Sequence, residues 1–132
     1  MNSFKKNTYV LLVAMLCTAS AFAGYAFVSG PKEKTFAYSP GDYFITNIAD
    51  SKSLLKSGMV IEVTDKKHFI ELTRNSHKAR DIIIGILRSK TYSEIKSPDI
   101  QLVLKEQIKE GISKTLNGIT VSDIYFNEFV VQ

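Results

Sequence analysis

The sequence has few of the residues from which disulfides and metal sites are built. It contains one cysteine, Cys17, and two histidines in 132 residues. A single cysteine forms no internal disulfide, and no cysteine or histidine lies at metal-site spacing from it. We expect a packed or lipid-facing thiol, because the preceding Leu16 is bulkier than the small residue that precedes a lipoprotein cysteine. The low cysteine count does not identify the compartment, since a domain of about 100 residues can be stable on its hydrophobic core alone.

Enzyme motifs are also missing. The sequence has no glycine-rich phosphate loop, no dinucleotide-binding G-x-G-x-x-G and no G-x-S-x-G nucleophile elbow. His68 and His77 fall within one predicted helix at a spacing that places them on opposite faces, so they cannot share a metal ion. Without paired carboxylates, a nucleophile–base pair or a metal cluster, the pattern argues against an enzyme and predicts neither cofactor nor metal.

The excess of positive charge is small and spread out. The net charge is +4, and Lys5 and Lys6 supply half of it. Apart from these two, the remaining 15 of the 17 basic residues are interspersed with 13 acidic ones. A nucleic-acid-binding protein normally concentrates its basic residues on one face. The charge pattern therefore predicts that nucleic acid is not a partner.

One long uncharged run is present near the N-terminus. Tyr9 to Val28 reads YVLLVAMLCTASAFAGYAFV, 20 residues without a charge. A helix of about 20 residues crosses a hydrocarbon core of roughly 30 Å and satisfies its own backbone groups in lipid. The run therefore predicts a transmembrane helix that anchors the chain. The large apolar residues of this anchor are Tyr9, Leu11, Leu12, Leu16, Phe22, Tyr25, Phe27 and Val28.

The same run also fits a cleaved signal sequence. Lys5 and Lys6 resemble a basic n-region, and Ala21-Phe22-Ala23 matches an A-x-A cleavage site. We favour the anchor, because the run continues apolar past that site and reaches spanning length. Both alternatives export the downstream chain. The predicted organisation is a short cytoplasmic tail (1–8), a transmembrane helix or uncleaved signal anchor (9–28), a linker (29–41) and an extracytoplasmic domain (42–132).

The exported domain is predicted to be α+β, with about three strands and two to three helices. A strand over 42–48 is rich in aromatic and β-branched residues, and a second strand over 59–64 alternates apolar and polar residues. We expect these two to form a hairpin. A third strand is predicted over 119–131, where imperfect alternation indicates either cover on both faces or a β-bulge near Asp123. We expect it to pair with an earlier strand and close a small antiparallel sheet.

Helix signals fill the segment between the second and third strands. Asp65 is expected to cap a long helix that runs to about Lys90. Its apolar residues cover an arc of roughly 200°, which is wider than one sheet face would cover. A second helix of the same domain is the simpler cover, and a neighbouring subunit is the alternative. Thr91-Tyr92-Ser93-Glu94 is a capping box that predicts a short helix.

A last helix is expected to start at Ser97-Pro98 and to stop at Asn117-Gly118. Gly111 falls on its apolar face, where it would permit close packing. The apolar face of this helix is predicted to comprise Ile100, Val103, Leu104, Ile108, Ile112 and Leu116.

Two stretches resemble the flagellar basal-body-associated FliL family. RDIIIGILRSKTYSEI (80–95) is similar to a family segment ending in LxSKTyeel, and IYFNEFVVQ (124–132) is similar to the family's closing VYFtxFVVQ. ITNIAD (45–50) resembles the family strand VNLaD, and the helix after Pro98 matches in position and length. The motif residues carried over are Asp81, Leu87, Arg88, Ser89, Lys90, Thr91, Tyr92, Asp123, Tyr125, Phe126, Phe129, Val130, Val131 and Gln132.

This resemblance implies a single-pass protein of the bacterial inner membrane with a periplasmic domain similar to the stomatin/SPFH fold. It also implies a homo-oligomer, possibly a ring, around or beside the flagellar stator, where it supports torque for swimming or swarming. No catalytic residues come with the family, and the motif residues are expected to specify the fold first and assembly second. The alternatives are a stomatin-like membrane scaffold unrelated to motility and a cleaved, soluble periplasmic binding module.

Overall fold

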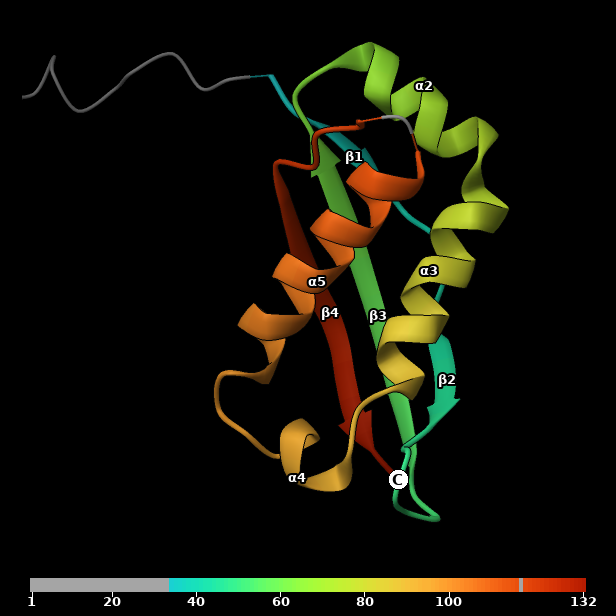
Figure 1. Ribbon diagram of the computed structural model, residues 1–132. Coiled ribbons are helices and arrows are strands. Elements are labelled where there is room, and N and C mark those ends of the chain that lie inside the picture. The colour runs from blue at the N-terminus through green and yellow to red at the C-terminus, as the bar shows by residue number, and fades with distance from the viewer. Residues whose placement is uncertain (1–33, 117) are drawn as a thin grey trace, which may run out of the picture. The chain divides into compact units, whose positions relative to one another are not determined.

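The computed structural model describes residues 34–116 and 118–132, which fold into an antiparallel sheet with helices packed on one of its faces (Figure 1). The α+β class is therefore confirmed. In chain order the elements are β1 (Phe36–Tyr38), β2 (Phe44–Asn47), β3 (Leu54–Val63), α2 (Lys66–Arg74), α3 (Ser76–Arg88), α4 (Tyr92–Ile95), α5 (Ile100–Thr115) and β4 (Asp123–Val131).

The predicted membrane anchor, residues 9–28, lies outside the described residues. Within the part of the chain that is described, no helix combines the length and the apolar character that crossing a membrane requires.

Strand β3 organises the sheet, because all three other strands pair with it in antiparallel fashion. Strand β4 runs along one edge of β3, from Leu55 to Glu62. The other edge is shared: β2 pairs with the first half of β3 and β1 with its end. The predicted hairpin between β2 and β3 is confirmed, and so is the pairing of the last strand with an earlier one.

The predicted strand over 42–48 is shorter, Phe44–Asn47, and the strand prediction was wrong in three further details. Residues 36–38, assigned to the linker, form β1, a strand of only 3 residues that gives too short a pattern to detect. Strand β3 begins at Leu54, five positions before the predicted start. The polar Ser57 interrupts the apolar pattern of the sequence, but in the structure it is buried on the helix-covered face, in the same row as Leu55. Strand β4 begins at Asp123 rather than at residue 119.

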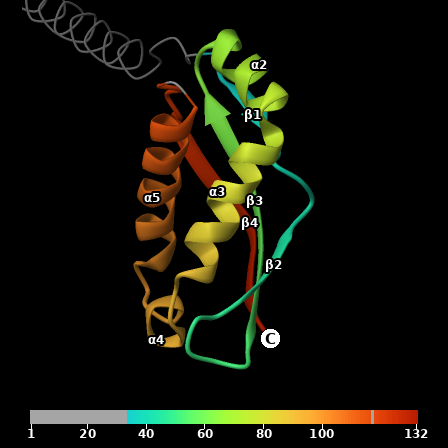
Figure 2. The ribbon, with the colours of Figure 1, turned by 45° about the vertical axis from the view of Figure 1, so that its right-hand side comes forward.

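Helices α2 to α5 lie on one side of strand β3 (Figure 2). Every second residue of β3 points to that side and is buried. Met59, Ile61 and Val63 are buried there, as the alternation predicted. Leu55 and Ser57 extend the same row. This face forms the hydrophobic core together with the inner sides of α2, α3 and α5.

The single helix predicted from Asp65 to about Lys90 is in fact two helices. Asp65 caps the first as predicted, since its Oδ1 accepts a hydrogen bond from the Lys67 N–H at 2.7 Å. Asn75 ends α2 and starts α3 with φ −107° and ψ 30°, outside the helical range. Its side-chain amide donates to the Glu71 carbonyl at 3.0 Å. Such local bonds from asparagine compete with helix continuation, and they account for the break.

The wide apolar arc of α3 is covered from two sides by its own domain. Ala79, Ile83 and Leu87 are fully buried, and α3 packs against both β2 and α5. Gly111 of α5 permits the close approach: a Cβ at this glycine would lie 2.8 Å from Cγ2 of Ile82. The second helix was the cover we favoured, and no neighbouring subunit is needed to explain the arc.

Besides the Asp65 cap of α2, two expected helix ends are confirmed and one differs. Thr91 and Glu94 form the reciprocal capping box of α4. After α5, Gly118 takes a positive φ of 76° and its N–H donates to the Ser113 carbonyl at 2.9 Å, as expected of a glycine stop. Helix α5 itself begins at Ile100, with Asp99 as its N-cap rather than Ser97.

Pro98 lies in a turn closed by the bond from the Ile100 N–H to the Ser97 carbonyl, 3.2 Å long. Val103, which was assigned to the apolar face of α5, is exposed.

Candidate functional site

Two of the motifs that carry the family resemblance meet in the fold. The residues after β2 lie against the connection from α3 to α4. There the Ala49 N–H donates to the Lys90 carbonyl at 2.9 Å, and the Tyr92 N–H donates to Oδ1 of Asp50 at 2.7 Å. The Tyr92 N–H is one of the unpaired donors at the start of α4, so Asp50 satisfies it. This contact assigns these motif residues a role in holding the fold.

The other residues of the 80–95 motif divide between core and surface. Leu87 is fully buried, and Lys90 is only 6% exposed. Ser89 ends α3 by donating its hydroxyl to the Ile86 carbonyl at 2.8 Å. Asp81 and Arg88 are exposed on α3.

The first residue of the last motif, Asp123, is tied to α5. Its Oδ1 lies 3.3 Å from Nζ of Lys105 and 3.8 Å from Nζ of Lys109. Partial burial raises the pKa of Asp123, but the 2.7 Å bond from the Ile124 N–H and the two lysines lower it by more. The net pKa of this carboxyl therefore lies below its ordinary value.

The remaining motif residues of β4 divide between the two faces of the sheet. Phe126, Phe129 and Val131 pair with buried β3 residues and pack on the core. Tyr125 and Val130 point to the opposite face and are exposed. Gln132 continues the ladder by exchanging two backbone bonds of 2.8 and 2.9 Å with Leu54. The motif therefore combines core residues with surface residues.

None of the helices in the described part of the chain covers the opposite face of the sheet, which we name the open face. The pairing register places side chains from three strands on it. At its centre Lys56 forms a 2.6 Å ion pair with Glu128 and lies 4.6 Å from the ring of Tyr43. A set of large apolar residues surrounds this pair, several of them strongly exposed. The open face comprises Tyr43, Ile45, Leu54, Val60, Tyr125 and Val130 around Lys56 and Glu128.

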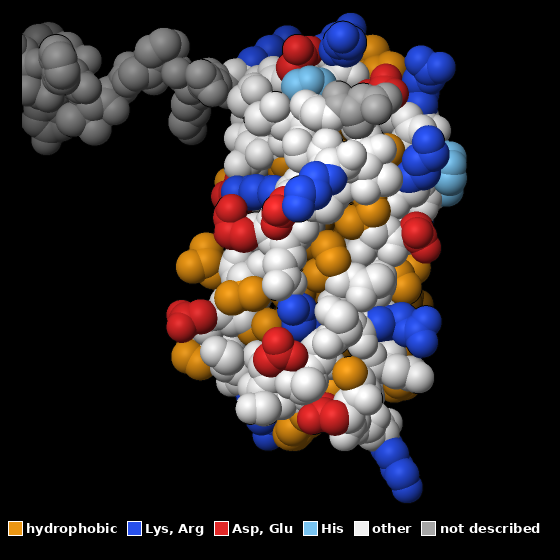
Figure 3. All heavy atoms as spheres, viewed as in Figure 1, with side chains coloured by type: hydrophobic (Ala, Val, Ile, Leu, Met, Phe, Trp, Pro, Cys, Tyr) orange, Lys and Arg blue, Asp and Glu red, His pale blue; other side chains and the backbone are white. Residues whose placement is uncertain are grey.

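The helix-covered side of the molecule has a different surface. Basic and acidic side chains are interspersed over it, with hydrophobic side chains visible between them (Figure 3). This mixture agrees with the charge pattern of the sequence. On this side the basic residues do not gather into the single-sign stripe typical of a nucleic-acid interface.

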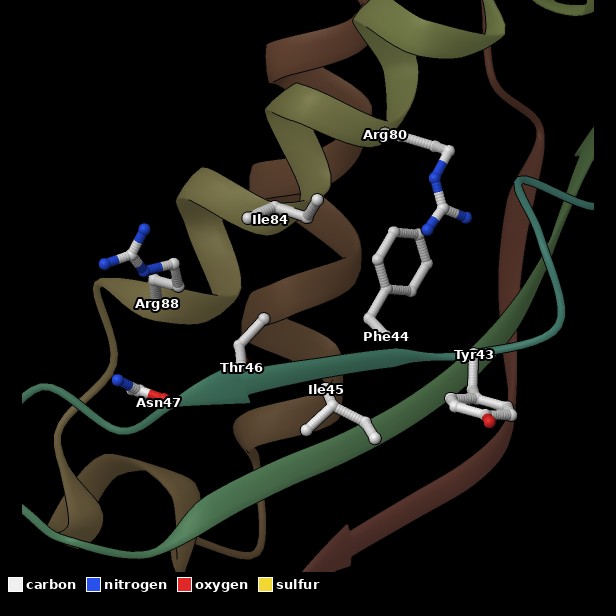
Figure 4. Close-up of a pocket in the computed structure, with 8 residues that line it drawn as sticks. All are labelled: Tyr43, Phe44, Ile45, Thr46, Asn47, Arg80, Ile84 and Arg88. Atoms are coloured by element: carbon white, nitrogen blue, oxygen red, sulfur yellow. The ribbon is translucent and has the colours of Figure 1, made fainter.

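A hollow of about 430 Å³ lies where α3 passes over β2, and we name it the β2–α3 groove (Figure 4). Arg80, Ile84 and Arg88 form its helix wall, and β2 forms its floor. The Arg80 guanidinium stacks 4.6 Å above the ring of Phe44 and donates to the Pro40 carbonyl. Thr46 points up toward the helix, and its buried Oγ1 has no hydrogen-bond partner among the described residues.

Of the residues that line this groove, only Arg88 was among the candidate site residues named from the sequence. The helix wall of the groove could have been found from the spacing of Arg80, Ile84 and Arg88, which places all three residues on one stripe of a helix.

The two histidines lie on different helices, His68 on α2 and His77 on α3. His77 is exposed, whereas His68 is half-buried and its Nδ1 lacks a partner within the described residues. Among residues 34–116 and 118–132, no group of three or more His, Cys, Asp or Glu side chains is placed to hold a metal ion.

Comparison with known proteins identifies the fold's family. The family model described as "Flagellar basal body-associated protein FliL" matches residues 37–132, from within β1 through the end of β4. The chain is also 32% identical over 104 residues to the flagellar protein FliL of Aquifex aeolicus (strain VF5), an alignment that covers 77% of this chain. The chain spans 65% of the length of that relative. Together these matches confirm the resemblance seen in the motifs, and the chain belongs to the FliL family of flagellar basal body-associated proteins.

Proposed function

We propose that this chain is a non-enzymatic accessory protein of the flagellar motor. The observation that carries the proposal is the family match, which begins within β1 and extends over every later strand and helix of the described domain. In this proposal residues 1–8 lie in the cytoplasm and Tyr9 to Val28 cross the inner membrane once. The folded domain, from Lys34 to Gln132, then lies in the periplasm, around or beside the stator, where it supports torque for swimming or swarming.

We propose further that the domain assembles with copies of itself through the open face. Support comes from its composition, because Ile45 is 57% exposed, Tyr125 49% and Val130 45% on one side of one sheet. Large exposed apolar side chains that share one face of a sheet fit an interaction surface. The ion pair between Lys56 and Glu128 would be covered at the centre of such an interface.

Chemical crosslinking of the full-length protein in its own membrane tests the assembly. We expect Val130→Lys to abolish crosslinked oligomers, because it places a charge within the apolar interface. Leu102→Lys is the control, since Leu102 is also exposed apolar surface, 62% against 45% for Val130, but lies on α5. Assembly through the open face is rejected if both variants crosslink like the unaltered protein.

The membrane anchor is tested by the mass of the mature protein together with membrane fractionation. An anchored chain retains residues 1–23 and stays with the membrane after a high-salt wash. A mature protein that starts at Gly24 and is released with the periplasmic contents would replace the anchor with the second alternative, a soluble periplasmic module.

The first alternative, a stomatin-like membrane scaffold, shares the expected anchor and assembly. The partner recovered by crosslinking separates the two, because a motor accessory is joined to stator or basal-body proteins and a general scaffold is not. Colocalisation of a fluorescently tagged chain with flagellar basal bodies gives the same distinction in living cells.

A further inference from the structure

One edge of strand β2 has no neighbouring strand among the described residues. Leu54 directs both its N–H and its C=O to Gln132 on the β4 side. Because backbone groups alternate along a strand, the next residue, Leu55, directs its own to the opposite side, where it pairs with Thr46 of β2. Thr46 therefore uses its backbone groups within the sheet.

The alternation then places the backbone groups of Ile45 and Asn47 at the outer edge of β2. Both residues are exposed and both line the β2–α3 groove. No backbone hydrogen bond outside the sheet ladder joins either residue to another described residue. An unpaired strand edge of this kind is a template for a further strand.

The two arginines on the helix wall of the groove are spaced to match every fourth residue of an extended strand. Arg80 and Arg88 are eight residues apart, which is about 12 Å along a helix axis, and Ile84 lies midway between them. A strand advances about 3.3 Å per residue, so 12 Å corresponds to roughly four of its residues. Strand residues i, i+2 and i+4 share one face. One face of an added strand would therefore meet Arg80, Ile84 and Arg88 in turn.

The charge of the groove selects the partner. The groove is lined by two arginines and by no acidic residue. Arg88 is exposed and forms no ion pair with the described residues. The guanidinium of arginine matches the two oxygens of a carboxylate. Thr46, a residue 4% exposed, also lines the groove, and its Oγ1 has no hydrogen-bond partner among the described residues.

We propose that the β2–α3 groove binds an extended acidic segment of another protein as an additional strand on β2. The segment has carboxylates at positions i and i+4, facing Arg80 and Arg88, and an apolar side chain at i+2 over Ile84. Residues 1–33 of this chain contain a single acidic residue, Glu33, so they cannot supply the spaced pair. This binding activity does not depend on the flagellar role, and its test uses no readout of motility.

The test uses the full-length protein in detergent micelles and the blocked synthetic peptide Ser-Glu-Thr-Val-Thr-Glu-Ser. Fluorescence anisotropy measures its affinity, and backbone amide NMR shifts locate it. We expect saturable binding, with shifts concentrated on β2 and on the outer side of α3. A peptide with lysine at both glutamate positions should bind at least about tenfold more weakly, because its charges are repelled by the arginines.

Two further probes examine the mode of binding. Neighbouring residues of a strand direct their N–H groups to opposite sides, so N-methylation of the valine and N-methylation of the preceding threonine should have unequal effects. One of the two peptides should bind like the unmodified peptide, and the other should lose binding. Equal effects would show that the peptide does not extend the sheet, and would overturn the proposal.

Arg88→Glu is the decisive variant, because Arg88 is exposed and its replacement leaves the core untouched. We expect about a tenfold loss of affinity for the acidic peptide. Arg74→Glu makes the same charge change on the exposed surface of α2 and should bind the peptide normally. Equal losses of peptide affinity in the two variants, or equal affinity for the glutamate and lysine peptides, would overturn the proposal. Backbone amide NMR shifts confined to the open face would also overturn it. So would the absence of saturable binding up to about 1 mM peptide.

Discussion

The rings of Phe126 and Phe129 meet edge-on, with their centroids 5.5 Å apart and their planes at 74°. Residues three apart in a regular strand point to opposite faces of the sheet, so this contact requires an irregularity. Phe126 pairs with Met59 and Glu128 pairs with Gly58, which leaves Asn127 as an extra residue in β4. The β-bulge at Asn127 is what places both rings on the core.

Deletion of Asn127 should be tolerated. Without the extra residue, Phe126, Glu128 and Phe129 follow the regular in–out–in alternation, and the same side chains reach the core. Deletion of Tyr125 also shortens β4 by one residue but turns Phe126 away from the core.

Urea unfolding, followed by circular dichroism, measures the stability of both deletions. We expect deletion of Asn127 to leave the free energy of unfolding within about 1 kcal/mol of that of the unaltered protein. We expect deletion of Tyr125 to lower it by about 2 kcal/mol or more. Equal losses in the two deletions would contradict the bulge assignment.

The imperfect alternation of β4 was visible in the sequence, but its cause was not located correctly. A bulge near Asp123 was one of two explanations, whereas the bulge lies at Asn127. A bulge depends on which β3 residue faces which β4 residue. That register is a tertiary property, and the sequence of β4 does not contain it.

Gly111 and Gly85 should respond in opposite ways to the same substitution. A Cβ at Gly111 would lie 2.8 Å from Cγ2 of Ile82, whereas a Cβ at Gly85 would meet nothing within 4 Å. Alanine favours a helix over glycine by about 1 kcal/mol. We expect Gly85→Ala to stabilise the domain by up to about that amount and Gly111→Ala to destabilise it by roughly 1–3 kcal/mol, because α3 and α5 must separate. Thermal unfolding of the two variants checks both signs.

Asp50→Ala should weaken the start of α4. Asp50 accepts the hydrogen bond of the Tyr92 N–H, and its removal leaves that donor without its protein partner. We expect a loss of about 1–2 kcal/mol of unfolding free energy and faster amide exchange at Tyr92. Asp42→Ala is the control, an exposed aspartate near β2 whose replacement should change stability by less than about 0.5 kcal/mol. Unchanged exchange at Tyr92 would argue that Asp50 does not hold this junction.

The ion pairs of Asp123 should make part of the stability dependent on pH. Because the pKa of Asp123 is lowered in the folded state, its contribution is present above the ordinary value of 3.8 and is lost as the pH falls through the lowered value. We expect Asp123→Asn to be less stable than the unaltered protein by about 0.5–1 kcal/mol at pH 7.

Urea unfolding between pH 2 and pH 7 should show this difference shrinking below about pH 4. A difference that stays constant down to pH 2 would show that the charge of Asp123 is not its cause. Asp81→Asn, on the exposed surface of α3, is the matched control and should change stability little at any pH.

Features encoded within a few residues were predicted well from the sequence. Asp65, the Thr91–Glu94 capping box and the Gly118 stop act on neighbouring backbone groups, so their patterns are sufficient. Strand β1 was missed because three residues carry almost no periodicity. The break at Asn75 was missed because the apolar periodicity continues across it.

The candidate sites show the same division. The motif residues were identified through the family resemblance, and the fold explains their split between core and surface. The β2–α3 groove was not predicted, because its two arginines acquire meaning only when α3 is packed over the free edge of β2. The open face likewise depends on the described helices, α2 to α5, lying on one side of the sheet.

The central claim, a role in the flagellar motor, is tested most directly by motility under load. The gene is deleted in its flagellated host, and swimming speed is measured over a range of medium viscosities, with the unaltered gene restored as the control. The account predicts that the deletion strain slows more steeply than the parent as viscosity rises, and that restoration returns the parental curve. Identical speeds of the deletion and parent strains at every viscosity, together with equal swarming, would contradict it.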